Sequence, residues 1–227
     1  MTAPLPPLDP HRARADKDLD SLVLGPEQAE RRLVLLHGWG ADADDLLDLG
    51  AALVADDPAV QLVALRAPGL HPAGQGRQWY DLQQPGWPEL PAARQALRQR
   101  LLTLAGTVPL ERTALLGFSQ GAAMALDVAA GALPLAALIA CSGYPHPDWQ
   151  PGAAATGPGR VLLSHGREDP VVPFAACAEI ERLLAASGLG PSSGRLECHG
   201  FSGGHGIDPS LFPRMAAVLA SAWAASD

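Results

Sequence analysis

Short aliphatic runs alternate with stretches of helical periodicity along this chain, and no other feature constrains the fold as strongly. A buried strand of a parallel sheet is apolar on both faces, so it appears as a compact run of Val, Leu, Ile and Ala. On this basis we expect strands at 32–37, 60–65, 113–116, 135–141, 161–164 and 195–199, and helices at 42–55, 91–104, 122–130, 174–186 and 209–225. The alternation predicts an α/β protein with a mostly parallel central sheet and helices on both faces.

The length of 227 residues favours one domain. Residues 1–20 are rich in proline and charge, so we expect a flexible N-terminal arm followed by a single domain over 21–227. The arm has no apolar core typical of a signal peptide, and no apolar stretch approaches the roughly 18 residues of a membrane span. A cytoplasmic protein is the default expectation.

Charge and cysteine content exclude several classes of protein. The net charge is −8, and the one basic run is the short segment 11–14, so no nucleic-acid partner is expected. The chain has three cysteines, an odd number, and no C-x-x-C spacing: Cys141, Cys177 and Cys198. They predict neither a disulfide framework nor a zinc site, and we expect no metal and no organic cofactor.

The sequence G-F-S-Q-G at 117–121 lies between an expected strand and an expected helix. Strand, sharp turn and helix form the context in which G-x-S-x-G holds a nucleophilic serine in a strained conformation, with glycines on both sides so that helix and strand can close around it. A chain with 24 glycines can also contain this pattern by chance. The hypothesis that Ser119 is a nucleophile therefore needs a base and an acid.

The base and the acid are sought after Ser119, because that is their order in enzymes with such a turn. Four histidines follow Ser119 and are candidates for the base: His146, His165, His199 and His205. Only His205 lies in a glycine-flanked loop between an expected strand and the last helix. His165 is expected to hydrogen-bond backbone in its own loop, and His199 to pack in a strand. Asp169 lies between a strand and a helix and is the expected acid, with the adjacent Glu168 as the alternative.

Ester chemistry also requires two backbone N–H groups aimed at the oxygen that becomes negative. Gln120, directly after the serine, is expected to supply one, and Trp39, in the His-Gly-Trp-Gly turn after the first buried strand, the other. The long segment 68–90 has no regular period and contains Trp79 and Trp87, which are candidate substrate-binding residues. Both could instead be core aromatics that cap this loop.

Taken together, these blocks resemble the carboxylesterase/phospholipase family of the α/β-hydrolase fold, which includes acyl-protein thioesterases. The matching blocks lie between about 33 and 207 and comprise L-H-G at 36–38, R-A-P at 66–68, W-Y-D at 79–81, G-F-S-Q-G at 117–121, S-G at 142–143, H-G-x-x-D-x-x-V-P at 165–173 and G-H at 204–205. The resemblance implies Ser119, Asp169 and His205 as catalytic residues, with Trp39 and Gln120 as oxyanion donors. Ala122 replaces a glycine usual in the family, and Ala41 an aspartate.

The expected function is a serine carboxylesterase that hydrolyses small to medium acyl esters, or thioesters, through an acyl-enzyme intermediate. A lysophospholipase or acyl-protein thioesterase is the alternative within the fold, and a non-catalytic ligand-binding relative the alternative from another class. The chain lacks the N-terminal cysteine that carries lipid in some relatives, so stable membrane anchoring is not implied. The sequence allows either a monomer or a homodimer that buries apolar residues around the mouth of the site.

Overall fold

A single large sheet forms the centre of the computed structural model, which describes residues 8–55, 57–130, 132–153 and 156–225. Among these residues, eight strands join in the order β1-β2-β4-β3-β7-β8-β9-β10. Their bounds are β1 Arg14–Asp16, β2 Ser21–Leu24, β3 Arg31–Leu36, β4 Val60–Leu65, β7 Thr113–Phe118, β8 Ala137–Cys141, β9 Arg160–Gly166 and β10 Leu196–Phe201. In this sheet β4, β3, β7, β8, β9 and β10 are all parallel. At one edge β2 pairs antiparallel with β4, and β1 pairs antiparallel with β2.

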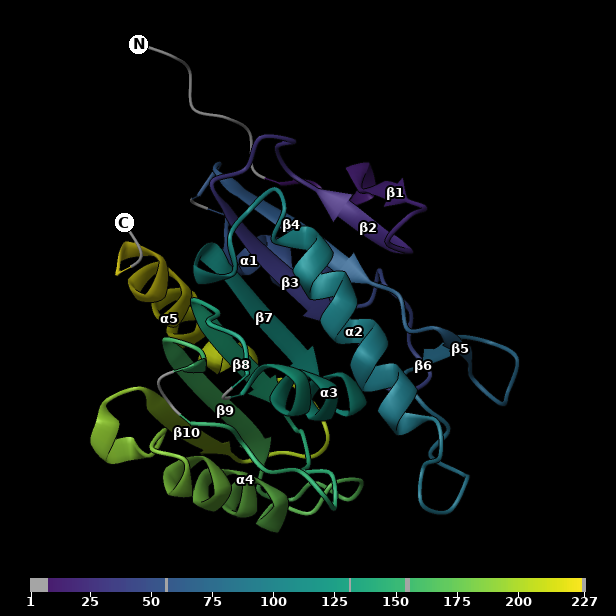
Figure 1. Ribbon diagram of the computed structural model, residues 1–227, viewed down its shortest axis with the longest axis vertical. Coiled ribbons are helices and arrows are strands. Elements are labelled where there is room, and N and C mark those ends of the chain that lie inside the picture. Colours follow the sequence, from purple (N-terminus) through teal and green to yellow (C-terminus); the bar gives the residue numbers. More distant parts are fainter. Residues whose placement is uncertain (1–7, 56, 131, 154–155, 226–227) are drawn as a thin grey trace.

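Helices cover both faces of this sheet (Figure 1). One face packs against α2 Leu90–Leu104, α3 Gln120–Ala129 and α4 Ala175–Ala186, and the other against α1 Leu47–Leu53 and α5 Phe212–Ala224. Successive residues of β3 alternate between the two cores, since Val34 and Leu36 face the first group of helices and Leu33 and Leu35 the second. The predicted α/β architecture is confirmed.

Several short elements also occur among the described residues. The segment 68–90 contains a small two-stranded sheet of β5 Gly69–Leu70 and β6 Arg77–Gln78. Single 3-10 turns are η1 Pro10–Arg12, η2 Leu110–Arg112, η4 Pro191–Ser193 and η5 Pro209–Leu211.

The first helix is shorter than predicted, because α1 begins only at Leu47. Asp42 Oδ1 accepts hydrogen bonds from the Ala43 N–H at 2.7 Å and from Arg66 Nε at 2.6 Å. An aspartate bonded to its own local backbone competes with a regular helix. Residues 43–46 therefore form turns, and the expected helix loses its first part.

The predicted arm is only partly described, since residues 1–7 lie outside the described residues. Residues 14–16 form β1, which pairs with β2 in the register Arg14 to Val23, Ala15 to Leu22 and Asp16 to Ser21. This second part of the arm belongs to the sheet, so the prediction of a loose segment up to residue 20 is corrected. A strand of three residues with two charged side chains has no aliphatic pattern that marks it in advance.

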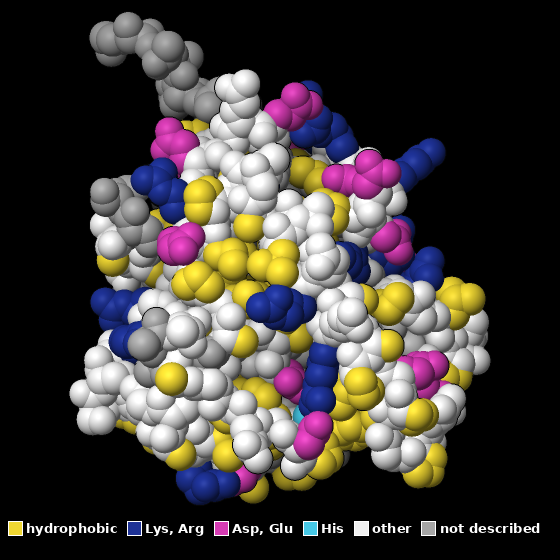
Figure 2. Space-filling model, viewed as in Figure 1, with side chains coloured by type: hydrophobic (Ala, Val, Ile, Leu, Met, Phe, Trp, Pro, Cys, Tyr) yellow, Lys and Arg dark blue, Asp and Glu magenta, His cyan; other side chains and the backbone are white. Residues whose placement is uncertain are grey.

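Basic and acidic side chains are interspersed on the face that α2 covers (Figure 2). No helix within the described parts of the chain combines the length and apolarity needed to cross a membrane.

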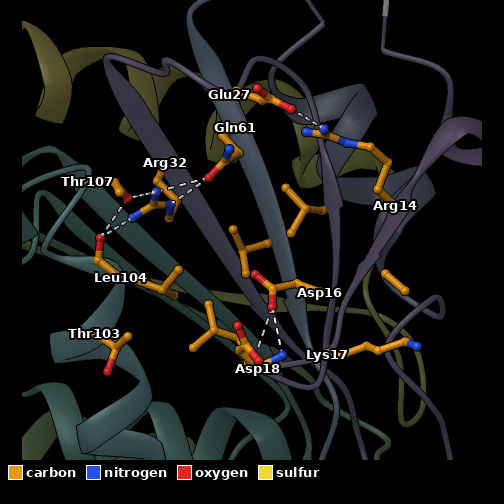
Figure 3. A pocket seen from close by; sticks show the side chains of 14 residues that line it. Arg14, Asp16, Lys17, Asp18, Glu27, Arg32, Gln61, Thr103, Leu104 and Thr107 are labelled. Atoms are coloured by element: carbon orange, nitrogen blue, oxygen red, sulfur yellow. Dashed lines mark hydrogen bonds and ion pairs between the residues drawn. The ribbon is translucent and has the colours of Figure 1, made fainter.

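A cavity of about 630 Å³ opens near the amino ends of β3 and β4, between the β1–β2 edge and the end of α2 (Figure 3). Arg32, only 2% exposed, lies in its wall. Its guanidinium donates to Gln61 Oε1 at 3.0 Å, to the Leu104 carbonyl at 2.6 Å and to Thr107 Oγ1 at 2.7 Å. Burial lowers the pKa of Arg32 to about 10, so it remains charged at neutral pH. Arg32 thus connects β3 and β4 to the end of α2. These contacts lie at the amino ends of the parallel strands, opposite the carboxyl ends.

Candidate active site

Ser119 lies in the sharp turn between β7 and α3 with φ 53° and ψ −117°. This backbone conformation is rare and costly for a residue with a side chain. A Cβ atom at Gly117 would lie 2.5 Å from the Gly121 carbonyl oxygen, and one at Gly121 would lie 2.2 Å from the Leu36 carbonyl oxygen. Glycines on both sides of Ser119 are therefore required by the close approach of strand and helix.

The structure brings Ser119, His205 and Asp169 into one hydrogen-bonded line. His205 Nε2 is 2.9 Å from Ser119 Oγ, and His205 Nδ1 is 2.7 Å from Asp169 Oδ2. With Nδ1–H donating to the carboxylate, Nε2 is free to accept the serine proton. Each of the three follows the carboxyl end of a parallel strand, which is why residues far apart in sequence meet at one edge of the sheet.

Asp169 is held in its ionised form by several donors. Its Oδ1 accepts from the N–H groups of Val171 and Val172, both at 2.8 Å. Burial opposes the charge, but the hydrogen bonds from His205, Val172 and Val171 outweigh it, so the pKa of Asp169 lies below its usual value. His165 Nε2 contacts the Val172 carbonyl at 2.9 Å, as expected, and also lies 3.4 Å from Asp169 Oδ2.

Glu168, the alternative acid, contacts the same loop in another way. Its Oε2 accepts from the Gly203 N–H at 2.5 Å, and its own N–H donates to the Gly203 carbonyl at 3.0 Å. Asp169, and not Glu168, is the carboxylate bonded to His205. Glu168 instead fastens the loop that carries the histidine.

The turn after β3 lies beside the serine. A Cβ atom at Gly38 would be 3.5 Å from Ser119 Cβ. His37 fixes this turn, since its Nδ1–H donates to the Gly38 carbonyl at 2.8 Å and its Nε2 accepts from the Ala67 N–H at 3.1 Å. Burial lowers the pKa of His37, in keeping with this neutral form. The backbone N–H groups of Trp39 and Gln120 have no hydrogen-bond acceptor among the described residues.

Trp39 is 36% exposed on this turn. Its indole N–H donates to Gln78 Oε1 at 2.9 Å, and the centre of its ring lies 4.1 Å from that of His71. Gly40 N–H donates to the Arg77 carbonyl at 2.8 Å. The small sheet of β5 and β6 is therefore fastened to the turn that bears Trp39.

Trp79 and Trp87 do not occupy equivalent places. Trp79 is 3% exposed, and its indole N–H donates to the His37 carbonyl at 2.9 Å, so it supports the Trp39 turn. Trp87, at φ 46°, packs against Tyr80 and Tyr144 with ring centres 5.3 and 6.0 Å away. The structure does not group either side chain with Ser119 and His205.

Sequence reasoning did not identify the part played by the Gln120 side chain. Its Oε1 accepts from the Trp79 N–H at 2.9 Å, and its Nε2 donates to the Tyr80 carbonyl at 2.8 Å. Ser142 was also missed: it adopts φ 49° and donates from Oγ to the Gly206 carbonyl, next to His205, at 3.0 Å. The W-Y-D and S-G blocks contain the only signals that point to these contacts.

This arrangement can transfer a proton from a hydroxyl to an imidazole backed by a carboxylate, next to two backbone N–H groups. Within the described residues, no three His, Cys, Asp or Glu side chains group as a metal ion would require.

Comparisons with known proteins identify the family and the fold. A model of the family described as phospholipase/carboxylesterase matches residues 20–221. Esterase YpfH of Escherichia coli (strain K12) is 32% identical over 178 residues, which span 74% of this chain and 75% of that protein. The crystal structure of esterase PE8 superposes with a TM-score of 0.75 at 29% identity and covers 88% of this chain and 96% of that one.

More distant structures show the same fold. The Bacillus cereus carboxylesterase has a TM-score of 0.75 at 20% identity, over 91% of this chain and 96% of that one. Zea mays acyl-protein thioesterase 2 has a TM-score of 0.70 at 22% identity, over 89% of this chain and 98% of that one.

Proposed function

Because this chain belongs to the phospholipase/carboxylesterase family, an esterase family of the α/β-hydrolase fold, we propose that it is a serine hydrolase that cleaves carboxylic esters through an acyl-enzyme. The observation that carries the proposal is the line from Ser119 through His205 to Asp169, with contacts of 2.9 and 2.7 Å. A serine hydroxyl is a poor nucleophile at neutral pH, and such a line is the arrangement that activates it.

In the first half-reaction, Ser119 Oγ attacks the ester carbonyl carbon while His205 Nε2 accepts the hydroxyl proton. The tetrahedral intermediate collapses as the bond to the leaving alcohol breaks, and His205 returns the proton to that alcohol. Water then attacks the acyl-serine with His205 as base, and the carboxylic acid and free Ser119 are released. Asp169 holds the imidazole tautomer and offsets its transient positive charge.

The oxyanion of both intermediates is proposed to accept hydrogen bonds from the backbone N–H groups of Trp39 and Gln120. Gln120 is the first residue of α3, so its N–H lies at the positive end of the helix dipole. Loss of one such donor typically costs about 100- to 1,000-fold in kcat. The side-chain contacts of Gln120 to residues 79 and 80 would keep this donor in place.

The proposed substrates are small to medium acyl esters, or thioesters. Trp39 and Val171, in the loops after β3 and β9, and Leu70, in β5, are exposed by 36%, 65% and 66% and offer apolar surface to an acyl chain. In place of direct substrate contact, Trp79 is proposed to support the Trp39 turn. The cytoplasm stays our expected location.

Hydrolysis of p-nitrophenyl acetate by the wild-type enzyme and by Ser119→Ala tests the proposal. We expect kcat/KM of the variant to fall by about 10⁴-fold or more. Equal turnover by both proteins would refute a serine mechanism. A non-catalytic ligand-binding protein would show no turnover in either.

Esters from acetyl to palmitoyl, with matched thioesters, test the substrate class. Preference for short chains supports the proposed carboxylesterase. Preference for palmitoyl substrates favours a lysophospholipase or an acyl-protein thioesterase.

A further inference from the structure

A second line of buried polar side chains runs beside the site and takes no part in the proposed proton transfers. His146 is 3% exposed, and its Nδ1 lies 2.5 Å from Asp127 Oδ2. Its Nε2 lies 2.9 Å from the Tyr80 hydroxyl, which in turn lies 2.6 Å from the Tyr144 hydroxyl. With Nδ1–H donating to Asp127, His146 Nε2 accepts from Tyr80, and Tyr80 accepts from Tyr144. Both ring nitrogens of His146 and both phenol hydroxyls then have a hydrogen-bond partner.

Asp127 pairs with an arginine, and this pair connects the line of polar side chains to two helices. Arg94 on α2 donates to Asp127 Oδ2 on α3 at 2.6 Å and forms a bidentate pair with Asp148 at 2.7 and 3.0 Å. The hydrogen bond to Asp148 is the main reason that the pKa of Arg94 is raised. The carboxylate that orients His146 is thus held between α2, α3 and the loop around residue 148.

The order Asp127, His146, Tyr80 resembles that of Asp169, His205, Ser119, but it is not a second catalytic centre. Tyr80 is fully buried, and burial raises the pKa of its phenol far above the usual value. A phenol that stays protonated and out of solvent cannot act as a nucleophile at neutral pH. The line must act through what Tyr80 holds.

Tyr80 lies in a short segment that contacts the Gln120 side chain and the turn that bears Trp39. The Tyr80 carbonyl accepts from Gln120 Nε2, and the N–H of the preceding Trp79 donates to Gln120 Oε1. The Trp79 indole N–H donates to the His37 carbonyl, in the turn that bears Trp39. Segment 79–80 is therefore fixed on one side by Gln120 and on the other by the ring of Tyr80.

We propose that His146, oriented by Asp127, is a positioning residue for ester hydrolysis: through the Tyr80 hydroxyl it fixes segment 79–80, and with it the backbone N–H groups of Gln120 and Trp39. This inference rests on the proposed function. It predicts that loss of the His146–Tyr80 hydrogen bond lowers kcat, because donors displaced by a fraction of an ångström bind the oxyanion less well, while substrate binding is retained.

Tyr80→Phe and His146→Phe test the role, since each removes the hydrogen bond and keeps an aromatic ring. With p-nitrophenyl acetate we expect kcat to fall by about 10- to 100-fold while KM changes by less than about twofold. The double variant should lose no more than the stronger single variant, because both changes break one link. Asp127→Asn carries the same test where His146→Phe fails to fold.

Tyr144→Phe is the matched control, because it removes a hydroxyl from the same cluster without breaking the link between His146 and Tyr80. Its kcat should stay within about threefold of wild type. Unchanged kcat in Tyr80→Phe and His146→Phe, losses that follow only the melting temperature, or a change confined to KM would overturn the proposal.

The Trp79 indole N–H resonance separates this inference from the proposed function. NMR can follow the exchange of this indole proton with solvent. The exchange should be faster in Tyr80→Phe and His146→Phe than in wild type and Tyr144→Phe. Faster exchange without any Ser119-dependent turnover in wild type would reject the proposed function and the catalytic role together. Unchanged exchange beside normal wild-type turnover would reject the positioning role alone.

Discussion

Asp169 and His205 lie 36 residues apart in the sequence, and the Oδ2 atom of the first is 2.7 Å from the Nδ1 atom of the second. The neighbouring carboxylate, Glu168, binds the backbone N–H of Gly203 instead. Two adjacent acids thus contact the same loop at different points. One contact orients the imidazole, and the other fastens the backbone that carries it.

Asp169→Asn should lower kcat by about 10³- to 10⁴-fold, because an amide favours the wrong imidazole tautomer and no longer offsets its charge. Glu168→Gln is the matched control and should lose less than about tenfold, since an amide oxygen can still accept from the Gly203 N–H. Steady-state hydrolysis of p-nitrophenyl acetate measures both. A greater loss for Glu168→Gln than for Asp169→Asn would reverse the assignment.

The lowered pKa of Asp169 makes stability depend on pH with a definite sign. The folded state binds this proton less readily than the unfolded state, so the ionised carboxylate adds stability above its ordinary pKa of about 4. That contribution is lost as the pH falls through the lower, folded value. Urea unfolding should therefore show wild type losing its advantage over Asp169→Asn below about pH 4. An advantage that grew on acidification would contradict this account.

Gly121→Ala should destabilise the protein although alanine is the better helix former. Helix propensity would gain about 1 kcal/mol, but the new Cβ atom would lie 2.2 Å from the Leu36 carbonyl oxygen. The clash should cost about 3 kcal/mol or more. In the control Gly206→Ala the Cβ atom meets no atom within 4 Å, so the free energy of unfolding should change by less than about 0.5 kcal/mol. Equal stability of the two variants would argue against close packing of α3 on β3.

Arg32→Lys should lower stability and leave the site intact. A lysine cannot reproduce the fork that donates to Gln61, Leu104 and Thr107, and the cost should be about 1–3 kcal/mol. Arg214→Lys, in an exposed pair with Glu197, should change the free energy of unfolding by less than about 0.5 kcal/mol. Urea unfolding and kcat should be measured together. A fall in kcat of Arg32→Lys that Arg214→Lys does not share would show coupling between the amino and carboxyl ends of the parallel strands.

The parallel strands could be predicted because a strand buried on both faces is aliphatic throughout, as in β3, β4 and β8. The meeting of Ser119, Asp169 and His205 could be anticipated for a related reason. Each follows such a strand, and the carboxyl ends of parallel strands share one edge. Local pattern and chain order were sufficient here.

The contacts that escaped prediction depend on pairing at long range. β1 is short and charged, so nothing local marks it as a strand until β2 is in place. His146 could be judged from the sequence only as a candidate base, because its partners Asp127 and Tyr80 lie on separate elements. The support that Trp79 gives to the His37 carbonyl is likewise visible only in the folded chain.

Mass spectrometry of the protein after reaction with a fluorophosphonate, with the label located at Ser119 or elsewhere, tests the central claim most directly. Intact-protein and peptide mass spectrometry should find one phosphonyl group on Ser119 of the wild type, loss of ester turnover in proportion to labelling, and no label on Ser119→Ala. Full ester turnover by an enzyme labelled at Ser119, or labelling of another residue with loss of activity, would contradict it.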